Sequence, residues 1–222
     1  MAKQWVYAFD DQRATSSDLL GGKGANLAEM TRIGLPVPPG FTITTEACNH
    51  YLNNQANIPD GLWEQSQDLL QTIETSLGQT FGGEENPLLL SVRSGARISM
   101  PGMMDTVLNL GLNDRTVRGL AAMADERFAY DCYRRLIHMF ADVVLKAPGE
   151  GFEDALDDAR RQERVANDSE LSAAAMATVV QEYKRLVLEH TGAEFPQDPY
   201  EQLRLATLAV FDSWNARRAV NY

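Results

Sequence analysis

Residues 88–111 constrain the fold most, because two apolar segments there flank a loop of small residues. The first segment, residues 88–92, is typical of a short buried strand, and the second spans residues 106–110. Arg93 follows the first segment directly, and the loop contains Arg97 together with glycine and proline. Backbone N–H groups and guanidinium groups at one hairpin tip can bind a single anion. The stretch therefore predicts a phosphate-binding loop, although such hairpins also occur without a ligand and Arg93 can equally pair with a surface carboxylate.

A second feature, at residues 21–24, favours the anion site. The diglycine Gly21-Gly22 precedes Lys23, and apolar residues recur at helical spacing from Ala25 onward. The start of a helix presents unpaired N–H groups and the positive end of the helix dipole, to which Lys23 adds a cation. The alternative role of these glycines is to pack the helix against a strand, with Lys23 in solvent. The segment lacks the GxxxxGK pattern followed by Ser or Thr that a Walker A loop requires.

Strands and helices alternate up to Gly111, and helices dominate beyond it. We expect strands at residues 5–9, 41–44, 88–92 and 106–110, and helices at residues 25–33, 45–53, 61–77, 113–123, 126–145, 172–190 and 199–214. Asn113 and Ser172 are expected N-caps, and residues 198–201 are an expected capping box. This order predicts an α+β fold. The acidic stretch between residues 150 and 170 is expected to be a solvated helical face rather than a cation site.

Composition excludes several classes of partner. The formal net charge of −11 argues against nucleic acid, which requires a basic face. The chain contains no apolar run near membrane-spanning length, so no membrane partner is expected. Cys48 and Cys132 lack metal-ligand spacing and fit free thiols in a reducing cytoplasm. The histidines, His50, His138 and His190, are scattered, so no metal site is expected.

Several long motifs resemble the pyruvate, phosphate dikinase family in order and spacing. The main ones are Gly-Gly-Lys-Gly-Ala-Asn-Leu-Ala-Glu-Met at residues 21–30, Pro-Pro-Gly-Phe-Thr-Ile-Thr-Thr-Glu-Ala at residues 38–47, and Ser-Val-Arg-Ser through Leu-Asn-Asp at residues 91–114. Further similar segments lie at residues 127–131, 194–197 and 209–215, so the resemblance covers essentially the whole chain. The loop Ser-Met-Pro-Gly-Met-Met-Asp-Thr separates this family from the related phosphoenolpyruvate synthases.

The resemblance implies an incomplete ATP-grasp-type nucleotide-binding lobe with a helical subdomain. Residues 1–111 and 198–222 would form the first lobe, and residues 112–197 would form the helical subdomain. The family's enzyme converts ATP, phosphate and pyruvate into AMP, pyrophosphate and phosphoenolpyruvate, passing a phosphoryl group through a phosphohistidine.

The resemblance also implies which residues bind ATP. Lys23 and Arg93 would contact the ATP phosphates, and the loop that bears Gly102 and Met104 would close over the phosphate end of the nucleotide. Arg97 is a further candidate in that loop. These positions agree with the anion site inferred above, because phosphoryl transfer requires mostly positioning and charge neutralisation.

Much of the family's machinery is expected outside this chain, including the ligands of Mg²⁺, the phosphohistidine domain and the domain that handles pyruvate. None of the histidines stands in the Thr-Ser-His context of the family's phosphoryl carrier, so no catalytic residue is assigned. The sequence stops at Tyr222 without a polar tail, and we therefore expect part of a longer enzyme. Alone it would be a monomer that does not complete the reaction, whereas the full-length family is homodimeric.

Two alternatives remain open. A truncated, non-catalytic remnant could bind a protein partner, and its mark would be an exposed apolar stripe on the helices at residues 126–145 or 172–190. An ATP-dependent phosphotransferase with another acceptor is the second alternative, and the Met-Pro-Gly loop argues against it.

Overall fold

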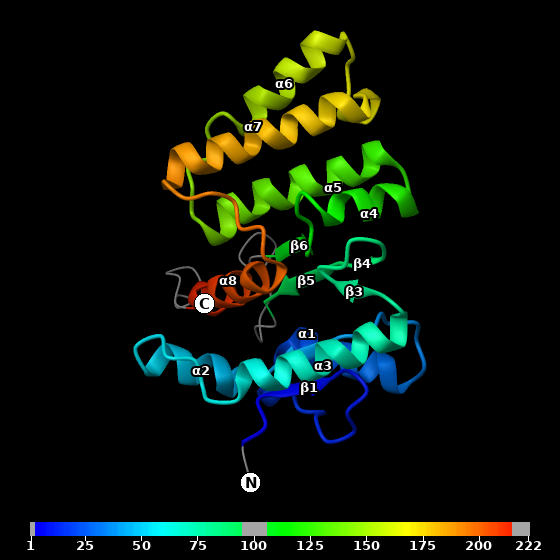
Figure 1. Cartoon of the computed structure of the whole chain (residues 1–222). Helices are drawn as coiled ribbons and strands as arrows, with labels where there is room; N and C mark the ends of the chain where they lie inside the picture. Colours follow the sequence, from blue (N-terminus) through cyan, green and yellow to red (C-terminus); the bar gives the residue numbers. More distant parts are fainter. Residues whose placement is uncertain (1–2, 95–105, 215–222) are drawn as a thin grey trace. The chain divides into compact units, whose positions relative to one another are not determined.

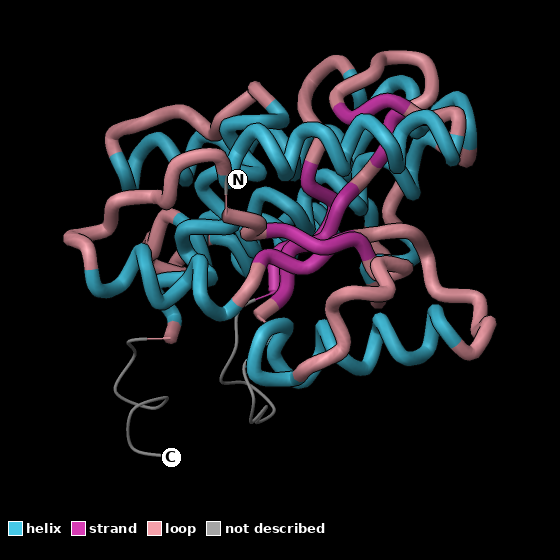
Figure 2. The backbone as a smooth tube through the Cα atoms, turned by 90° about the horizontal axis from the view of Figure 1, so that it is seen from below, coloured by secondary structure: helices cyan, strands magenta, loops and turns pink. Residues whose placement is uncertain are grey.

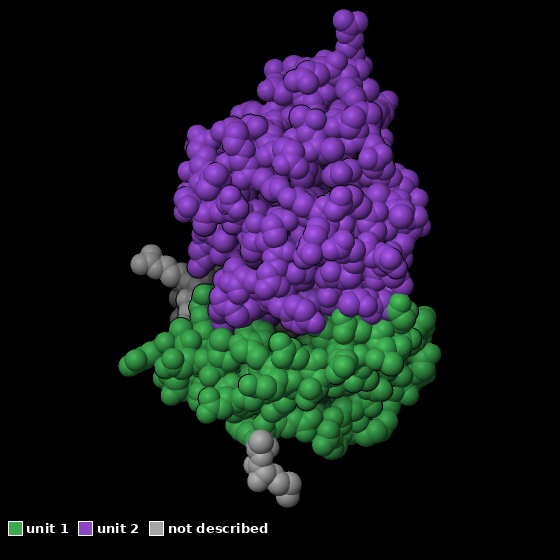
Figure 3. All heavy atoms as spheres, in the orientation of Figure 1, with its two compact units in different colours: residues 1–78, 93–105, 210–222 green, residues 79–92, 106–209 purple. Residues whose placement is uncertain are grey.

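The computed structural model describes residues 3–94 and 106–214. It divides the chain into two compact units: unit 1 comprises residues 1–78, 93–105 and 210–222, and unit 2 comprises residues 79–92 and 106–209 (Figure 3). Helices predominate and the strands are short, so the predicted α+β class is confirmed (Figure 1, Figure 2). The units are defined by compactness, and the division into a first lobe and a helical subdomain stays a prediction. Among the residues described, no helix combines the length and the apolar character needed to cross a bilayer.

Unit 1 is built around two short antiparallel strands with helices packed on them. The strands are β1 (Val6–Ala8) and β2 (Phe41–Ile43), and the helices are α1 (Ser17–Arg32), α2 (Thr45–Asn53) and α3 (Leu62–Leu77). The α2 helix has the predicted bounds, and the Thr44 hydroxyl caps it by accepting a hydrogen bond from the Ala47 N–H at 3.2 Å. The α3 helix buries Leu62, Leu70 and Ile73, as their helical spacing predicts.

The last turn of α8 (Pro199–Ser213) completes unit 1. The Phe211 ring lies 5.4 Å from the Tyr51 ring of α2, measured between centroids. The Tyr51 hydroxyl donates to the Asp212 carboxylate at 3.1 Å, across 161 positions of the sequence. Burial and the neighbouring Asp212 raise the pKa of Tyr51, so this hydroxyl remains a donor. An apolar contact and a hydrogen bond thus hold the end of α8 on α2.

The strands of unit 2 form two separate pairs. They are β3 (Thr80–Phe81), β4 (Pro87–Leu88), β5 (Leu90–Arg93) and β6 (Thr106–Leu110), with β3 parallel to β4 and β5 paired with β6. The predicted strand at residues 106–110 is confirmed. The single strand predicted at residues 88–92 is wrong, because the chain changes its pairing partner at Leu89. An unbroken apolar run does not reveal such a change, since apolar side chains suit either pairing.

The remaining part of unit 2 is helical, and α7 packs against both α5 and α6 (Figure 1). The elements are α4 (Thr116–Met123), α5 (Glu126–Met139), the π-helix η1 (Phe140–Val144), α6 (Phe152–Glu163), the 3₁₀ helix η2 (Asp168–Glu170) and α7 (Ala173–Thr191). The α-helix predicted over residues 126–145 therefore becomes a π-helix from Phe140 onward. Ser172 is confirmed as an N-cap, since its hydroxyl accepts a hydrogen bond from the Ala175 N–H at 3.1 Å.

Two predicted caps differ in detail. The α4 helix begins at Thr116 rather than directly after Asn113, although the Asn113 side-chain oxygen still accepts hydrogen bonds from the N–H groups of Arg115 and Thr116 at 2.9 and 2.8 Å. At the start of α8, the Asp198 carboxylate accepts a hydrogen bond from the Tyr200 N–H at 3.0 Å. The reciprocal half of the capping box is not seen, because the Glu201 carboxylate binds the Arg204 guanidinium instead. At the start of α4, by contrast, the Thr116 hydroxyl accepts a hydrogen bond from the Asn113 N–H at 2.9 Å, so the reciprocal pair is present there.

A buried glutamine on α8, Gln202, forms hydrogen bonds with the bend after β6 and with the segment that precedes α8. Its side-chain oxygen accepts a hydrogen bond from the Gly111 N–H at 2.9 Å, and its amide donates to the carbonyls of Leu112 at 2.9 Å and Pro196 at 2.8 Å. Gly111 has a φ of 105°, and a Cβ at this position would lie 3.0 Å from the Leu88 carbonyl oxygen. Buried backbone groups need partners, so Gln202 makes the tight bend after β6 possible.

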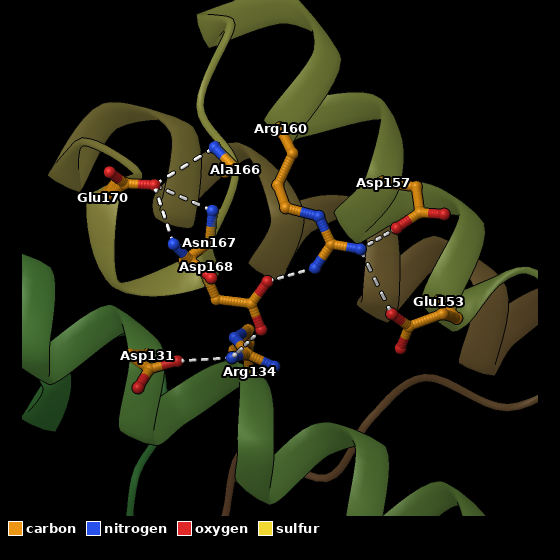
Figure 4. Close-up of polar contacts among 9 residues, drawn as sticks. All are labelled: Asp131, Arg134, Glu153, Asp157, Arg160, Ala166, Asn167, Asp168 and Glu170. Carbon is orange, nitrogen blue, oxygen red and sulfur yellow. Dashed lines mark hydrogen bonds and ion pairs between the residues drawn. The ribbon is translucent and has the colours of Figure 1, made fainter.

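An ion-pair cluster connects α5, α6 and η2 (Figure 4). The Arg134 guanidinium is buried and lies 2.7 Å from the Asp131 carboxylate and 3.3 Å from the Asp168 carboxylate. Arg160 donates to Asp157 and to Asp168, so Asp168 bridges the two arginines. The other carboxylates of α6 are exposed, in agreement with the predicted solvated face. The cluster has a structural role, because each arginine is matched by carboxylates.

Replacing Gln202 by Leu should lower the free energy of unfolding by about 3 kcal/mol or more, because two buried backbone groups and one partly buried carbonyl lose their partner at roughly 1–3 kcal/mol each. Urea unfolding followed by circular dichroism measures the effect. Gln181→Leu on the exposed face of α7 is the matched control and should change the free energy by less than about 1 kcal/mol. A Gln202→Leu variant as stable as the wild type would contradict this role.

His138 on α5 lies in an aromatic cluster. Its ring stacks on Phe152 with 4.9 Å between centroids and an interplanar angle of 5°, and Tyr183 meets both rings edge-on. Burial lowers the pKa of His138 more than the nearby Asp142 raises it. The folded state therefore favours the neutral imidazole.

This lowered pKa predicts a loss of stability in acid. The contribution of His138 is complete above the ordinary histidine pKa of about 6.5 and is lost as the pH falls below it, since the unfolded chain binds the proton more readily. Arg134 opposes protonation and Glu153 favours it, but burial is the larger effect. Between about pH 7.5 and 5.5, urea unfolding should show a larger loss for the wild type than for His138→Phe, which keeps a stacking ring that cannot titrate. Equal losses would show that His138 does not contribute.

Candidate nucleotide-binding site

The α1 helix is broken at the diglycine. The Ser16 side chain caps the first turn by accepting a hydrogen bond from the Asp18 N–H at 3.1 Å, and helical structure begins at Ser17. Gly21 then leaves the helical conformation with φ 69° and ψ 171°, which glycine tolerates best. A second helical segment starts directly after it, so the N–H groups of its first turn come from Gly22 and the residues that follow. The predicted helix start at the diglycine is correct for this second segment, whereas the turn before it was not predicted.

Gly24 lets the second segment of α1 approach β2. A Cβ on Gly24 would lie 2.8 Å from Thr42 Cγ2, 2.9 Å from Thr42 Oγ1 and 3.1 Å from Leu20 Cβ. Packing of helix against strand, the alternative to an anion site, is therefore the role of Gly24. This packing does not exclude an anion site at Lys23, because Lys23 is only half-buried and does not take part in the contact.

Arg93 lies at the end of β5 with its side chain exposed. The next residue, Ser94, has no solvent exposure, and its hydroxyl oxygen accepts a hydrogen bond from Trp214 Nε1 at 3.1 Å. Sequence reasoning missed this pair. The alternation of Leu90, Val92 and Ser94 at every second position was a signal that Ser94 lies inward, but nothing in the sequence indicates its partner.

Lys23 and Arg93 belong to the same compact unit. Within the described residues, neither side chain forms an ion pair with a carboxylate. The other predicted site residues, Arg97, Gly102 and Met104, lie outside the residues that the structure describes. Their role stays a prediction.

The chain is a nucleotide-binding domain of the α+β class, since a family model for such domains matches residues 17–77 and 54–222. That model is described as "Pyruvate phosphate dikinase, AMP/ATP-binding domain", and the chain belongs to this family. The resemblance seen in the motifs is therefore confirmed.

Curated relatives carry the same family name. The chain is 53% identical over 226 residues to pyruvate, phosphate dikinase 1, chloroplastic, of Arabidopsis thaliana, covering 100% of this chain and 24% of that protein. It is 55% identical over 221 residues to the chloroplastic enzyme of Mesembryanthemum crystallinum, covering 98% and 23%. It is 50% identical over 220 residues to pyruvate, phosphate dikinase of Entamoeba histolytica, covering 99% and 25%. The chain thus spans about a quarter of the length of these relatives.

Replacing Gly24 by Ala should lower the free energy of unfolding by about 1–3 kcal/mol, because the new methyl group overlaps the Thr42 side chain. Adding Thr42→Ala should recover part of the loss, since it removes both atoms in the closest contact. Gly149→Ala is the control, because no atom lies within 4 Å of a Cβ there. Thermal unfolding compares the variants, and equal stability of the Gly24 and Gly149 variants would rule out the close approach of α1 to β2.

Proposed function

We propose that this chain is the ATP-binding part of a pyruvate, phosphate dikinase. The observation that carries the proposal is the family match over residues 17–222, supported by identities near one half across the chain. The complete reaction would convert ATP, phosphate and pyruvate into AMP, pyrophosphate and phosphoenolpyruvate through a phosphohistidine. The contribution of this chain would be to hold and orient the phosphates of ATP, while pyruvate and phosphate would be handled by other parts of the complete enzyme.

Within this proposal, Lys23 and Arg93 neutralise the charge of the triphosphate. The N–H groups at the start of the second α1 segment add donors, and the helix dipole has its positive end there. Arg93 can donate two parallel hydrogen bonds to one phosphate group, which Lys23 cannot. Arg97 and the loop with Gly102 and Met104 would complete the contacts to the phosphate end. Phosphoryl transfer depends mainly on this kind of positioning and charge neutralisation.

Mg²⁺ would bridge and further neutralise the phosphates when ATP is bound. Among the residues that the structure describes, no group of three or more His, Cys, Asp or Glu side chains could hold a metal ion. Mg²⁺ on a nucleotide needs only one or two protein carboxylates beside the phosphates, and we propose that these carboxylates come from other parts of the complete enzyme.

The protein-interaction alternative is less well supported. Its mark would be an apolar stripe on the helices at residues 126–145 or 172–190. Within the described residues, the large apolar side chains exposed on α5 and α7 are Phe128 and Leu188, one on each helix. Single exposed apolar residues are normal on protein surfaces, so they do not favour a docking face.

The compartment and the assembly state are part of the same proposal. Cys48 and Cys132 are free thiols, and burial raises the pKa of Cys48 to about 12, which keeps this thiol unreactive. Free thiols support a reducing compartment such as the cytoplasm. We propose that the chain by itself is a monomer.

Replacing Arg93 by Leu should weaken ATP binding by roughly tenfold or more, the loss expected for a hydrogen bond to a charged group. Lys23→Met should weaken binding in the same direction. Titration calorimetry of the chain with ATP and Mg²⁺ measures the dissociation constants.

Arg32→Leu is the matched control for both variants, because Arg32 is an exposed cation in the last turn of α1, at the opposite end of the helix dipole. It should leave the affinity unchanged. An Arg93→Leu variant that binds ATP as tightly as the wild type would remove Arg93 from the site, and a wild type that does not bind ATP would refute the proposal that this chain by itself holds the phosphates of ATP.

A further inference from the structure

The side chains from Leu90 to Ser94 alternate between the two faces of β5. Leu90 and Val92 are partly buried and Ser94 is fully buried, while Ser91 and Arg93 are exposed. Successive side chains of a strand point to opposite faces, so the inward position of Ser94 keeps Arg93 on the outward face. A slip of one residue would turn the Arg93 side chain inward. Whatever fixes Ser94 therefore fixes the direction of Arg93.

Ser94 is held by the residue that follows α8. Trp214 Nε1 donates to Ser94 Oγ at 3.1 Å, across 120 positions of the sequence. Trp214 stands directly after the last turn of α8, which the contacts of Phe211 and Asp212 hold on Tyr51. Ser94 has no access to solvent, so water cannot replace this hydrogen bond when it is lost. Trp214 is thus itself held in place within unit 1.

We infer that the hydrogen bond between Ser94 and Trp214 is a positioning contact for Arg93. It holds the backbone one residue beyond Arg93, and so presents the guanidinium group to an anionic ligand before that ligand arrives. A cation whose backbone is already ordered loses less conformational freedom on binding, and its affinity for the ligand is higher for that reason. The inference rests on the function proposed above, in which Arg93 binds the phosphates of ATP. Ser94 and Trp214 act through Arg93 and need no contact with the nucleotide.

Two variants of the chain remove the contact from opposite sides. Ser94→Ala deletes the acceptor, and Trp214→Phe deletes the donor while it keeps an aromatic ring. Each should weaken ATP binding by roughly fivefold in titration calorimetry with ATP and Mg²⁺, after correction for the folded fraction. The double variant should be little weaker than either single variant, because both remove the same interaction. If Ser94→Ala fails to fold, Trp214→Phe carries the test by itself.

Trp5→Phe is the matched control. Trp5 is a buried tryptophan of the same unit whose Nε1 donates to the Asp60 carbonyl at 3.0 Å. The substitution removes the same kind of hydrogen bond away from β5. It should reduce the free energy of unfolding to a similar extent as Trp214→Phe and leave ATP affinity unchanged. An equal loss of affinity in Trp5→Phe would show a general loss of stability and would overturn the inference.

An Arg93→Leu background separates positioning from direct binding. There Trp214→Phe should have no further effect on ATP affinity, because the side chain that it positions is absent. A further fivefold loss in that background would overturn the inference, and so would unchanged affinity of Ser94→Ala and Trp214→Phe in the original background. Either result leaves the proposed function intact as long as the wild type binds ATP. A wild type that does not bind ATP would refute the proposal that this chain by itself holds the phosphates of ATP, and this inference with it.

Discussion

The pairing of buried backbone groups at the bend after β6 is the constraint on which unit 2 depends. Gln202 binds the N–H and carbonyl groups of this bend and a carbonyl of the segment before α8. The Thr116 hydroxyl adds a hydrogen bond to the Gly111 carbonyl at 2.8 Å, and the Asn113 amide adds one to the Gln197 carbonyl at 2.8 Å. These side chains take the place of water at a bend where the backbone is buried. The start of α4 and the start of α8 are thereby held against the end of β6.

Some residues of the motifs that resemble the family have a structural role in unit 2 and need no contact with a ligand. The Asp114 carboxylate, in the Leu-Asn-Asp motif, accepts hydrogen bonds from the Tyr133 hydroxyl at 3.0 Å and from Lys184 Nζ at 2.6 Å. Burial raises the pKa of Tyr133, which keeps its hydroxyl protonated. Gln197, in the Glu-Phe-Pro-Gln motif, donates to the same hydroxyl at 3.1 Å. These residues build the helical part of the fold, whereas the proposed contacts to nucleotide come from Lys23 and Arg93.

The sequence predicted the bounds of those elements whose ends depend on neighbouring residues. The α2 helix and β6 have their predicted bounds, because the Thr44 cap and the apolar run at residues 106–110 act over neighbouring positions. The division of the strand near Leu89 could not be predicted, since it depends on which strands lie alongside. For the candidate site, the sequence predicted Lys23 at the start of a helix and Arg93 at the end of a strand. It did not predict the bend at Gly21 or the anchor at Ser94.

The sequence by itself determined the α+β class, the positions of most helices and the family, because periodic patterns and long motifs are written in consecutive residues. Only the tertiary structure decided that Gln202 forms hydrogen bonds with the backbone of the bend after β6, and that Trp214 donates a hydrogen bond to Ser94. These contacts join residues 91 and 120 positions apart. A glutamine or a tryptophan can form hydrogen bonds with many partners, and the path of the chain between the two ends selects which one it meets. For that reason the direction of Arg93 is a property of the fold rather than of the motif that contains it.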